Sequence, residues 1–201
     1  MKRLLRAVSL GVLFSATVFG ATGDLRLIEA VKNGDVAAVR ILLDQHFDVN
    51  VAEPDGATAL AWAAERDEIE TADLLIQSGA NVNAANDNGA TPLWLAATRA
   101  SARMTGKLLG AGANPNAALV SGETALMAAA STGNMDVVRA LMTHGADVNA
   151  REIRGSQTAL MWAIAEKRSE VARYLIEHGA DVKTKSKAGL TPFLFAAQQG
   201  E

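Results

Sequence analysis

A segment of about 33 residues recurs along the chain, and this period constrains the fold more than any other feature of the sequence. The copies open at Thr58, Thr91, Thr124, Thr158 and Thr191, at spacings of 33, 33, 34 and 33 residues. Periods in this range are typical of solenoids, in which each unit buries its apolar face against the next. The 201 residues therefore predict one elongated body with a continuous core.

The composition favours short, closely packed helices over sheet. The chain is 49% hydrophobic but only 4% aromatic, and alanine is abundant. Sheets are usually richer in β-branched and aromatic residues. The absence of cysteine excludes disulfides, zinc–thiolate sites and thiol catalysis.

Each unit has the same internal plan. A threonine that can cap a helix precedes an alanine-rich apolar segment, and a second apolar segment follows after a short break. A polar loop then runs to a turn rich in Asn, Asp and Gly. The second helix is expected to stop at a glycine in the C′ position, and these glycines are Gly79, Gly112, Gly145 and Gly179.

The opening segments are TALAWAA (58–64), TPLWLAA (91–97), TALMAAA (124–130), TALMWAI (158–164) and TPFLFAA (191–197), and GADVN or a close variant stands at 79–83, 112–116, 145–149 and 179–183. On these segments the chain resembles the ankyrin-repeat family. The resemblance implies an all-α solenoid of stacked helix-turn-helix units with hairpin-like loops. It divides residues 24–201 into units 24–56, 57–89, 90–122, 123–156 and 157–189 and a partial unit 190–201.

The first unit is predicted to be an N-terminal cap. Leu27, Ala30 and Val31 lie on one face of its first helix and point inward, whereas Arg26, Glu29 and Lys32 face water.

Four departures from the repeat carry expectations. His46 replaces the C′ glycine in the first unit, so that loop is expected to be rearranged. Residues 98–104 lack a glycine or charged turn, so the helices of the third unit are expected to be joined differently. The extra residue around 155–157 predicts a lengthened hairpin tip. The family's usual histidine is replaced by apolar or small residues, which are Ala61, Trp94, Met127, Met161 and Leu194.

No cofactor, metal or catalytic site is predicted. Met127, Met161, Trp62 and Trp162 recur at the repeat spacing inside apolar segments and are assigned to the core. His144 and His178 occupy equivalent positions in neighbouring units, which are spaced by helix packing at roughly 8–10 Å, whereas a metal–histidine bond is about 2 Å. No nucleophile, base and orienting group can be assembled.

Residues 1–23 have the pattern of a secretory signal peptide. Three cations among the first six residues precede an uncharged, mostly apolar run at 7–19, which is shorter than the roughly 20 residues of a membrane span. Small residues allow cleavage near Gly20 or Gly23. We expect a bacterial protein that is periplasmic or secreted, with no membrane span in the mature chain. An uncleaved signal anchor remains the alternative.

The last unit ends where a second helix is expected to begin, which predicts that the natural chain continues; a frayed natural terminus is the alternative. Two functions follow. The leading one is a non-catalytic protein–protein interaction module, expected to be a monomeric array. The other is a targeting or docking segment of a larger enzyme whose catalytic domain lies beyond residue 201.

The resemblance implies that a partner protein binds the concave face, which is made from hairpin tips and the exposed ends of first helices. Val120 and Ile153 are apolar at tips and are candidate anchors, although any single tip residue can be ordinary surface. The positions that map onto this face are Pro54, Asp55, Ala57, Glu65, Arg66, Asp87, Asn88, Ala90, Thr98, Arg99, Val120, Ser121, Glu123, Ser131, Thr132, Ile153, Arg154, Glu166, Lys187 and Gln198.

Charge is distributed unevenly along the chain. Residues 24–90 carry 4 Lys and Arg against 13 Asp and Glu, and residues 91–201 carry 12 against 9. Such an asymmetry can steer a charged partner, although drift of solvated surface charge has the same result. Beyond residue 23 the chain has 16 cationic and 22 acidic residues, without a basic stripe interleaved with aromatics, which disfavours nucleic-acid binding.

Overall fold

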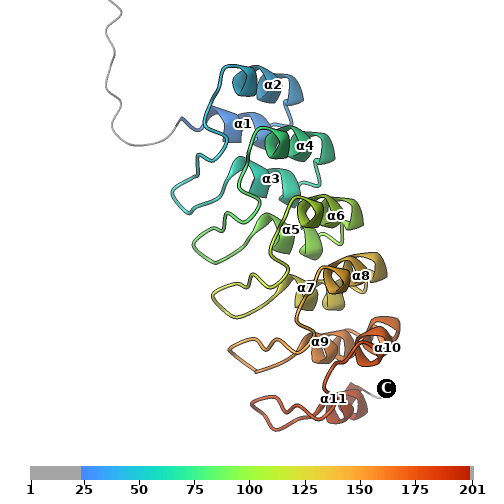
Figure 1. Cartoon of the computed structure of the whole chain (residues 1–201). Coiled ribbons are helices and arrows are strands. Elements are labelled where there is room, and N and C mark those ends of the chain that lie inside the picture. The colour runs from blue at the N-terminus through green and yellow to red at the C-terminus, as the bar shows by residue number, and fades with distance from the viewer. Residues whose placement is uncertain (1–23, 200–201) are drawn as a thin grey trace, which may run out of the picture.

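A computed structural model describes residues 24–199 as a stack of helix pairs, and the predicted all-α solenoid is confirmed (Figure 1). No strand occurs in these residues. The predicted signal peptide lies outside them. The pairs are α1 (Arg26–Lys32) with α2 (Val36–Asp44), α3 (Ala59–Glu65) with α4 (Ile69–Gln77), α5 (Pro92–Thr98) with α6 (Ala102–Gly110), α7 (Ala125–Thr132) with α8 (Met135–Thr143), and α9 (Ala159–Ala165) with α10 (Ser169–Glu177), and α11 (Pro192–Gln199) follows alone.

The helices form two layers, and long loops project from the side of the first helices (Figure 1). The odd-numbered helices pack on one another along the array, and each of α1 to α9 also packs on the even-numbered helix that follows it. Alanines at equivalent positions make this close approach possible, because Ala63, Ala96, Ala129 and Ala163 are completely buried. The core is continuous from α1 to α10, as a solenoid requires.

The first unit has the predicted cap structure. Leu27 and Val31 are fully buried and Ala30 nearly so, whereas Arg26, Glu29 and Lys32 are exposed. Helix α1 thus has one apolar face that packs on the array and one face that is exposed to solvent.

Threonine caps four of the first helices. The hydroxyl oxygens of Thr58, Thr91, Thr124 and Thr191 accept hydrogen bonds from the backbone N–H three residues further on, at 3.2–3.4 Å. Thr158 differs, because its hydroxyl is buried without a partner. The expected cap is therefore missing from α9.

The loop after α2 is not rearranged, so the expectation for His46 is wrong. His46 adopts φ 59°, in the left-handed region where the later units place glycine. Its N–H donates to Leu43 O at 2.9 Å, and the N–H of Phe47 donates to Leu42 O at 3.1 Å. The same two bonds close the loop after α4, so the protein accepts roughly 1 kcal/mol of backbone strain rather than a new loop.

The helices of the third unit are joined like the others, so that expectation is also wrong. Ala100 takes φ 55°, close to the 57° of Asp67 and the 55° of Lys167 at the equivalent positions. Ser101 then caps α6 by accepting a hydrogen bond from the N–H of Met104 at 3.1 Å. The hydrogen bonds of the turn are sufficient to impose a left-handed residue on a sequence without glycine.

The extra residue of the fourth unit lies in a lengthened hairpin tip, as predicted. Ser156 there has φ 53°. The carboxylate of Glu152, which is only 6% exposed, accepts hydrogen bonds from the N–H groups of Arg154, Gly155 and Gln157 at 2.5, 2.7 and 3.0 Å. One buried side chain thus organises the whole tip.

Candidate functional site

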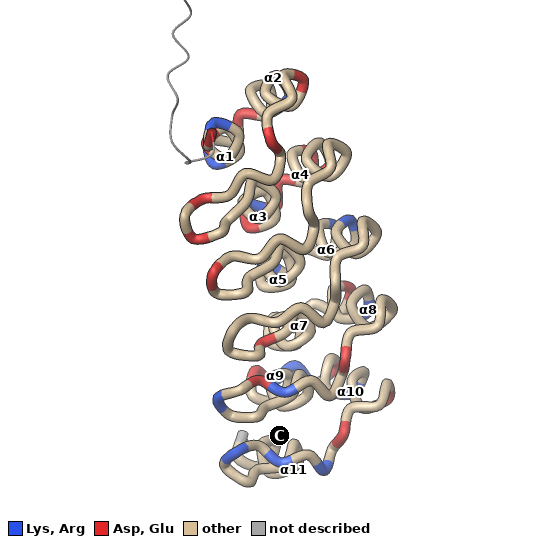
Figure 2. The backbone as a smooth tube through the Cα atoms, turned by 60° about the vertical axis from the view of Figure 1, so that its left-hand side comes forward, with Lys and Arg blue, Asp and Glu red and all other residues tan. Residues whose placement is uncertain are grey.

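The hairpin tips form a row along one edge of the array, and hydrogen bonds join neighbouring tips. In Figure 2, acidic residues mark the tips beside α3 and α5, and basic residues mark the tips beside α9 and α11. The bonds between tips run from Asp87 N to Asp55 O (2.8 Å), Val120 N to Asn88 O (2.9 Å), Ile153 N to Ser121 O (2.7 Å) and Lys187 N to Gly155 O (2.7 Å). Predicted binding residues therefore sit on a fixed backbone frame.

A ladder of asparagines holds the loops at the other end of the hairpins. Asn83 accepts a hydrogen bond from the N–H of Asn114 at 2.7 Å and donates to Gly112 O at 3.1 Å, both in the next unit. Asn50, Asn116 and Asn149 make the same pair of bonds. This ladder gives the last asparagine of the GADVN segment its structural role and fixes the spacing of successive units.

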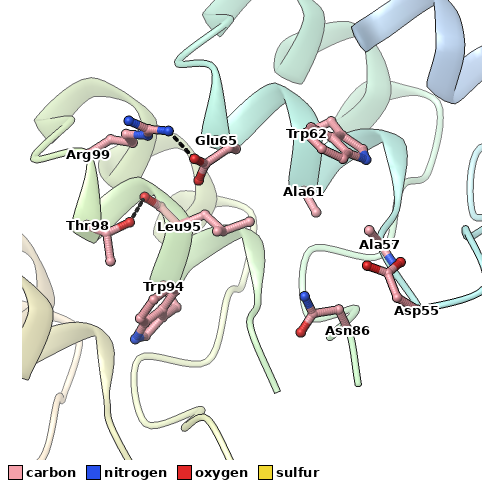
Figure 3. Close-up of a pocket in the computed structure, with 10 residues that line it drawn as sticks. All are labelled: Asp55, Ala57, Ala61, Trp62, Glu65, Asn86, Trp94, Leu95, Thr98 and Arg99. Carbon is pink, nitrogen blue, oxygen red and sulfur yellow. Dashed lines mark hydrogen bonds and ion pairs between the residues drawn. The ribbon is translucent and has the colours of Figure 1, made fainter. Parts of the chain in front are cut away.

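Between the tips and the first helices of units two and three lies a pocket of about 530 Å³ (Figure 3). Five of its residues were predicted to bind a partner, which are Asp55, Ala57, Glu65, Thr98 and Arg99. Five others were not, which are Ala61, Trp62, Asn86, Trp94 and Leu95. The helical period offered a signal for Trp62, because it lies three residues before Glu65 on the same helix face.

The assignment of the recurring large residues to the core is half right. Met127 and Met161 are fully buried, but Trp62 and Trp162 are only half-buried. Trp62 lines the pocket described above, and Glu53 and Lys32 contact its indole ring. Its Nε1–H donates to Glu53 Oε2 at 2.6 Å, Lys32 donates to Glu53 Oε1 at 2.9 Å, and the Lys32 ammonium lies 4.4 Å from the centre of the indole ring.

The cations in this half of the groove are paired with glutamates. Glu65 pairs with Arg99 across the pocket (Figure 3), and Arg66 contacts Glu68 at 2.6 Å. Asp55 and Asp87, on adjacent tips, make no ion pair within residues 24–199. The tips of units two and three therefore present uncompensated negative charge.

A second pocket, of about 440 Å³, lies on the other side of Trp94, between units three and four. Trp94 and Ser121 both line it, and Trp94 Nε1 and Ser121 Oγ are buried without a hydrogen-bond partner. Val120, at its edge, is 69% exposed, and Ile153 on the next tip is 61% exposed. The two predicted apolar anchors are thus on the surface beside unsatisfied polar atoms.

The remaining predicted residues fall into three groups. Ala57 and Ala90 are only 8% and 6% exposed; their carbonyls accept hydrogen bonds across the hairpin, and they line the first and the second pocket, respectively. Thr98 and Thr132 turn their hydroxyls to carbonyls of their own helices. The third group is exposed or half-exposed along the inner face and comprises Pro54, Asn88, Glu123, Ser131, Arg154, Glu166, Lys187 and Gln198.

The histidines lie away from this face. His46 follows α2, and His144 and His178 end α8 and α10, where each Nδ1 bonds to a helix carbonyl at 2.8 and 2.7 Å. Within residues 24–199 no group of three or more His, Asp or Glu side chains could hold a metal ion. No helix of this part of the chain is long and apolar enough to cross a membrane.

Comparison with models of known protein families finds a match. A family model described as ankyrin repeats (3 copies) matches residues 27–118 and 101–186, which together cover well over half of the chain. The search of curated proteins found no match to the chain.

Proposed function

The chain belongs to the ankyrin-repeat family, whose repeats generally mediate protein–protein interaction, and from this premise we propose that it is a non-catalytic module that binds one partner protein along its inner face. The observation that carries the proposal is the pair of pockets on either side of Trp94. Both lie between the hairpin tips and the first helices, and Trp94 and Leu95 line both of them. Such pockets suit the buried anchor residues that dominate binding energy.

The position of the titratable groups supports a role without catalysis. All three histidines follow second helices, and those at 144 and 178 are bonded to helix carbonyls. On the inner face Glu65 pairs with Arg99, whereas the tip carboxylates of Asp55 and Asp87 make no ion pair within residues 24–199. These groups can recognise and orient a partner surface.

We further propose that the protein is bacterial and is exported to the periplasm or the medium as a monomeric array. The support is the sequence of residues 1–23, in which Lys2, Arg3 and Arg6 precede an uncharged run and cleavage near Gly20 or Gly23 is possible. The alternative, a docking segment of a larger enzyme, predicts a heavier mature chain.

Affinity capture from the exported fraction tests both proposals. The tagged protein is expected to have an intact mass that lacks residues 1–20 or 1–23 and to retain one partner. Charge reversal on the tips, by Asp87→Lys or Arg154→Glu, should lower the affinity for that partner about tenfold or more. Close charge pairs at interfaces typically contribute over about 1.4 kcal/mol of binding free energy. The matched control is Arg103→Glu, on the exposed side of α6.

Retention of the partner by both tip variants, with loss in Arg103→Glu, would show that the other face binds. An intact mass that includes residue 1 would refute cleavage of the signal.

A further inference from the structure

We propose that the groove formed by the two pockets beside Trp94 binds a proline-rich, basic segment of the partner in the polyproline II conformation. This inference rests on the proposed function and names the chemistry of the segment bound. We call the two pockets together the Trp94 groove; it is lined by residues of units two to four.

The walls of the groove suit proline and other apolar side chains. Trp62 and Trp94 stand at opposite ends of the first pocket, with Ala61 and Leu95 between them (Figure 3). Proline-rich segments dock in aromatic-lined grooves because they are already extended and lose little conformational entropy on binding.

The spacing of the pockets favours this conformation over a β-strand. The pockets are one repeat apart, and packed helices are separated by roughly 8–10 Å. A polyproline II segment has three residues per turn and rises about 9 Å per turn, so residues i and i+3 would enter successive pockets. In a β-strand, side chains on one face recur at about 7 Å, which does not match.

Trp94 provides a hydrogen-bond donor that has no acceptor in the protein. Its indole nitrogen lies at the edge of the ring away from Leu95 (Figure 3) and is buried without a partner, as is Ser121 Oγ nearby in the second pocket. A buried donor without a partner is costly. Polyproline II backbone has no internal hydrogen bonds, so its carbonyls are free to accept from Trp94.

Charge at the tips of units two and three specifies a cation at that end of the segment, whereas Arg154, which makes no ion pair in the described residues, lines the second pocket at the other end. Asp55 and Asp87 are exposed, lie on tips joined by a 2.8 Å backbone bond and make no ion pair in the described residues, whereas Lys32, Arg66 and Arg99 are each held by a glutamate. An arginine or lysine flanking the prolines would meet these carboxylates.

The test is fluorescence anisotropy with a labelled synthetic peptide of about ten residues that has proline at every third position and one terminal arginine. Saturable binding to the full mature array is expected. Asp87→Asn should weaken binding roughly five- to tenfold, and so should replacement of the arginine by glutamate. Trp94→Phe, which keeps a ring but removes the N–H, should weaken it roughly fivefold.

Trp162→Phe is the matched control. Trp162 also has a buried indole nitrogen without a partner, but it lies in unit five, beside the basic tips. Its replacement should leave the affinity unchanged. Equal losses in both tryptophan variants, tighter binding of a proline-free basic peptide, or no saturable binding up to about 1 mM would overturn the inference.

Failure here is distinguishable from failure of the proposed function. If the peptide does not bind but the captured partner is still lost on Asp87→Lys, the inner face binds a segment of other chemistry. If the partner is also indifferent to both tip variants, the proposed function fails as well.

Discussion

Replacing Gly89 with alanine is expected to destabilise the array by about 3 kcal/mol in urea denaturation. Gly89 has φ +82°, where any other residue is strained. In addition, a Cβ at this position would lie 2.8 Å from Ala118 O and 3.0 Å from Leu119 Cα, both backbone atoms of the next hairpin. The substitution therefore strains the backbone at residue 89 and displaces the hairpin of the next unit.

Gly112→Ala separates these two contributions. Gly112 has φ +89°, but its Cβ would meet no atom within 4 Å. We expect it to cost only the backbone strain, about 1–2 kcal/mol. Equal losses of stability in the two variants would show that the contact between adjacent tips contributes nothing.

Glu152→Ala is expected to destabilise the protein by about 2 kcal/mol and to disorder the tip of the fourth unit. The substitution removes the acceptor of three backbone N–H groups at 2.5–3.0 Å. Hydrogen bonds to a charged acceptor contribute more than neutral ones. Hydrogen exchange at Arg154, Gly155 and Gln157 should accelerate along with the loss of stability.

Glu166→Ala provides the comparison, because Glu166 is an exposed glutamate with no ion pair in the described chain. Its removal is expected to change stability by less than about 0.5 kcal/mol. If Glu152→Ala behaves in the same way and leaves exchange at the tip unaltered, then the tip is held by its backbone alone.

The repeat period made the fold predictable, because each unit repeats the same pattern of helix caps, apolar segments and turn residues. Helix positions, the left-handed C′ glycines and the burial of Met127 and Met161 all follow from a 33-residue period combined with helical periodicity. The exposed tip residues Asp55, Asp87, Val120 and Ile153 were also predictable as surface, because they vary between units.

Where the sequence departs from the repeat, predictions from the conformational preference of single residues were wrong for two turns. His46 and Ala100 are not glycines, yet both adopt positive φ, and each turn is closed by backbone hydrogen bonds to the helix that precedes it. A cost of roughly 1 kcal/mol per residue is small beside the packing of a whole unit. A single-position preference is thus overridden by its context.

The groove itself was only partly predictable. The tip and helix-end residues Asp55, Glu65 and Arg99 were predicted to face a partner, but Trp62 was assigned to the core and Trp94 was not predicted to bind. Tryptophan is amphipathic, so its position in an apolar segment does not show which of its atoms are exposed. The folded structure shows that both rings line the first pocket and that Trp94 also lines the second.

Site-specific photo-cross-linking tests the central claim, binding of a partner protein to the inner face, most directly. A photoreactive phenylalanine analogue would replace Val120, which is 69% exposed at a tip, or Arg103, which is exposed on α6 in the opposite layer. In cells that express the full chain, we predict one discrete adduct from position 120 and none from position 103. An adduct from position 103 alone would contradict the account.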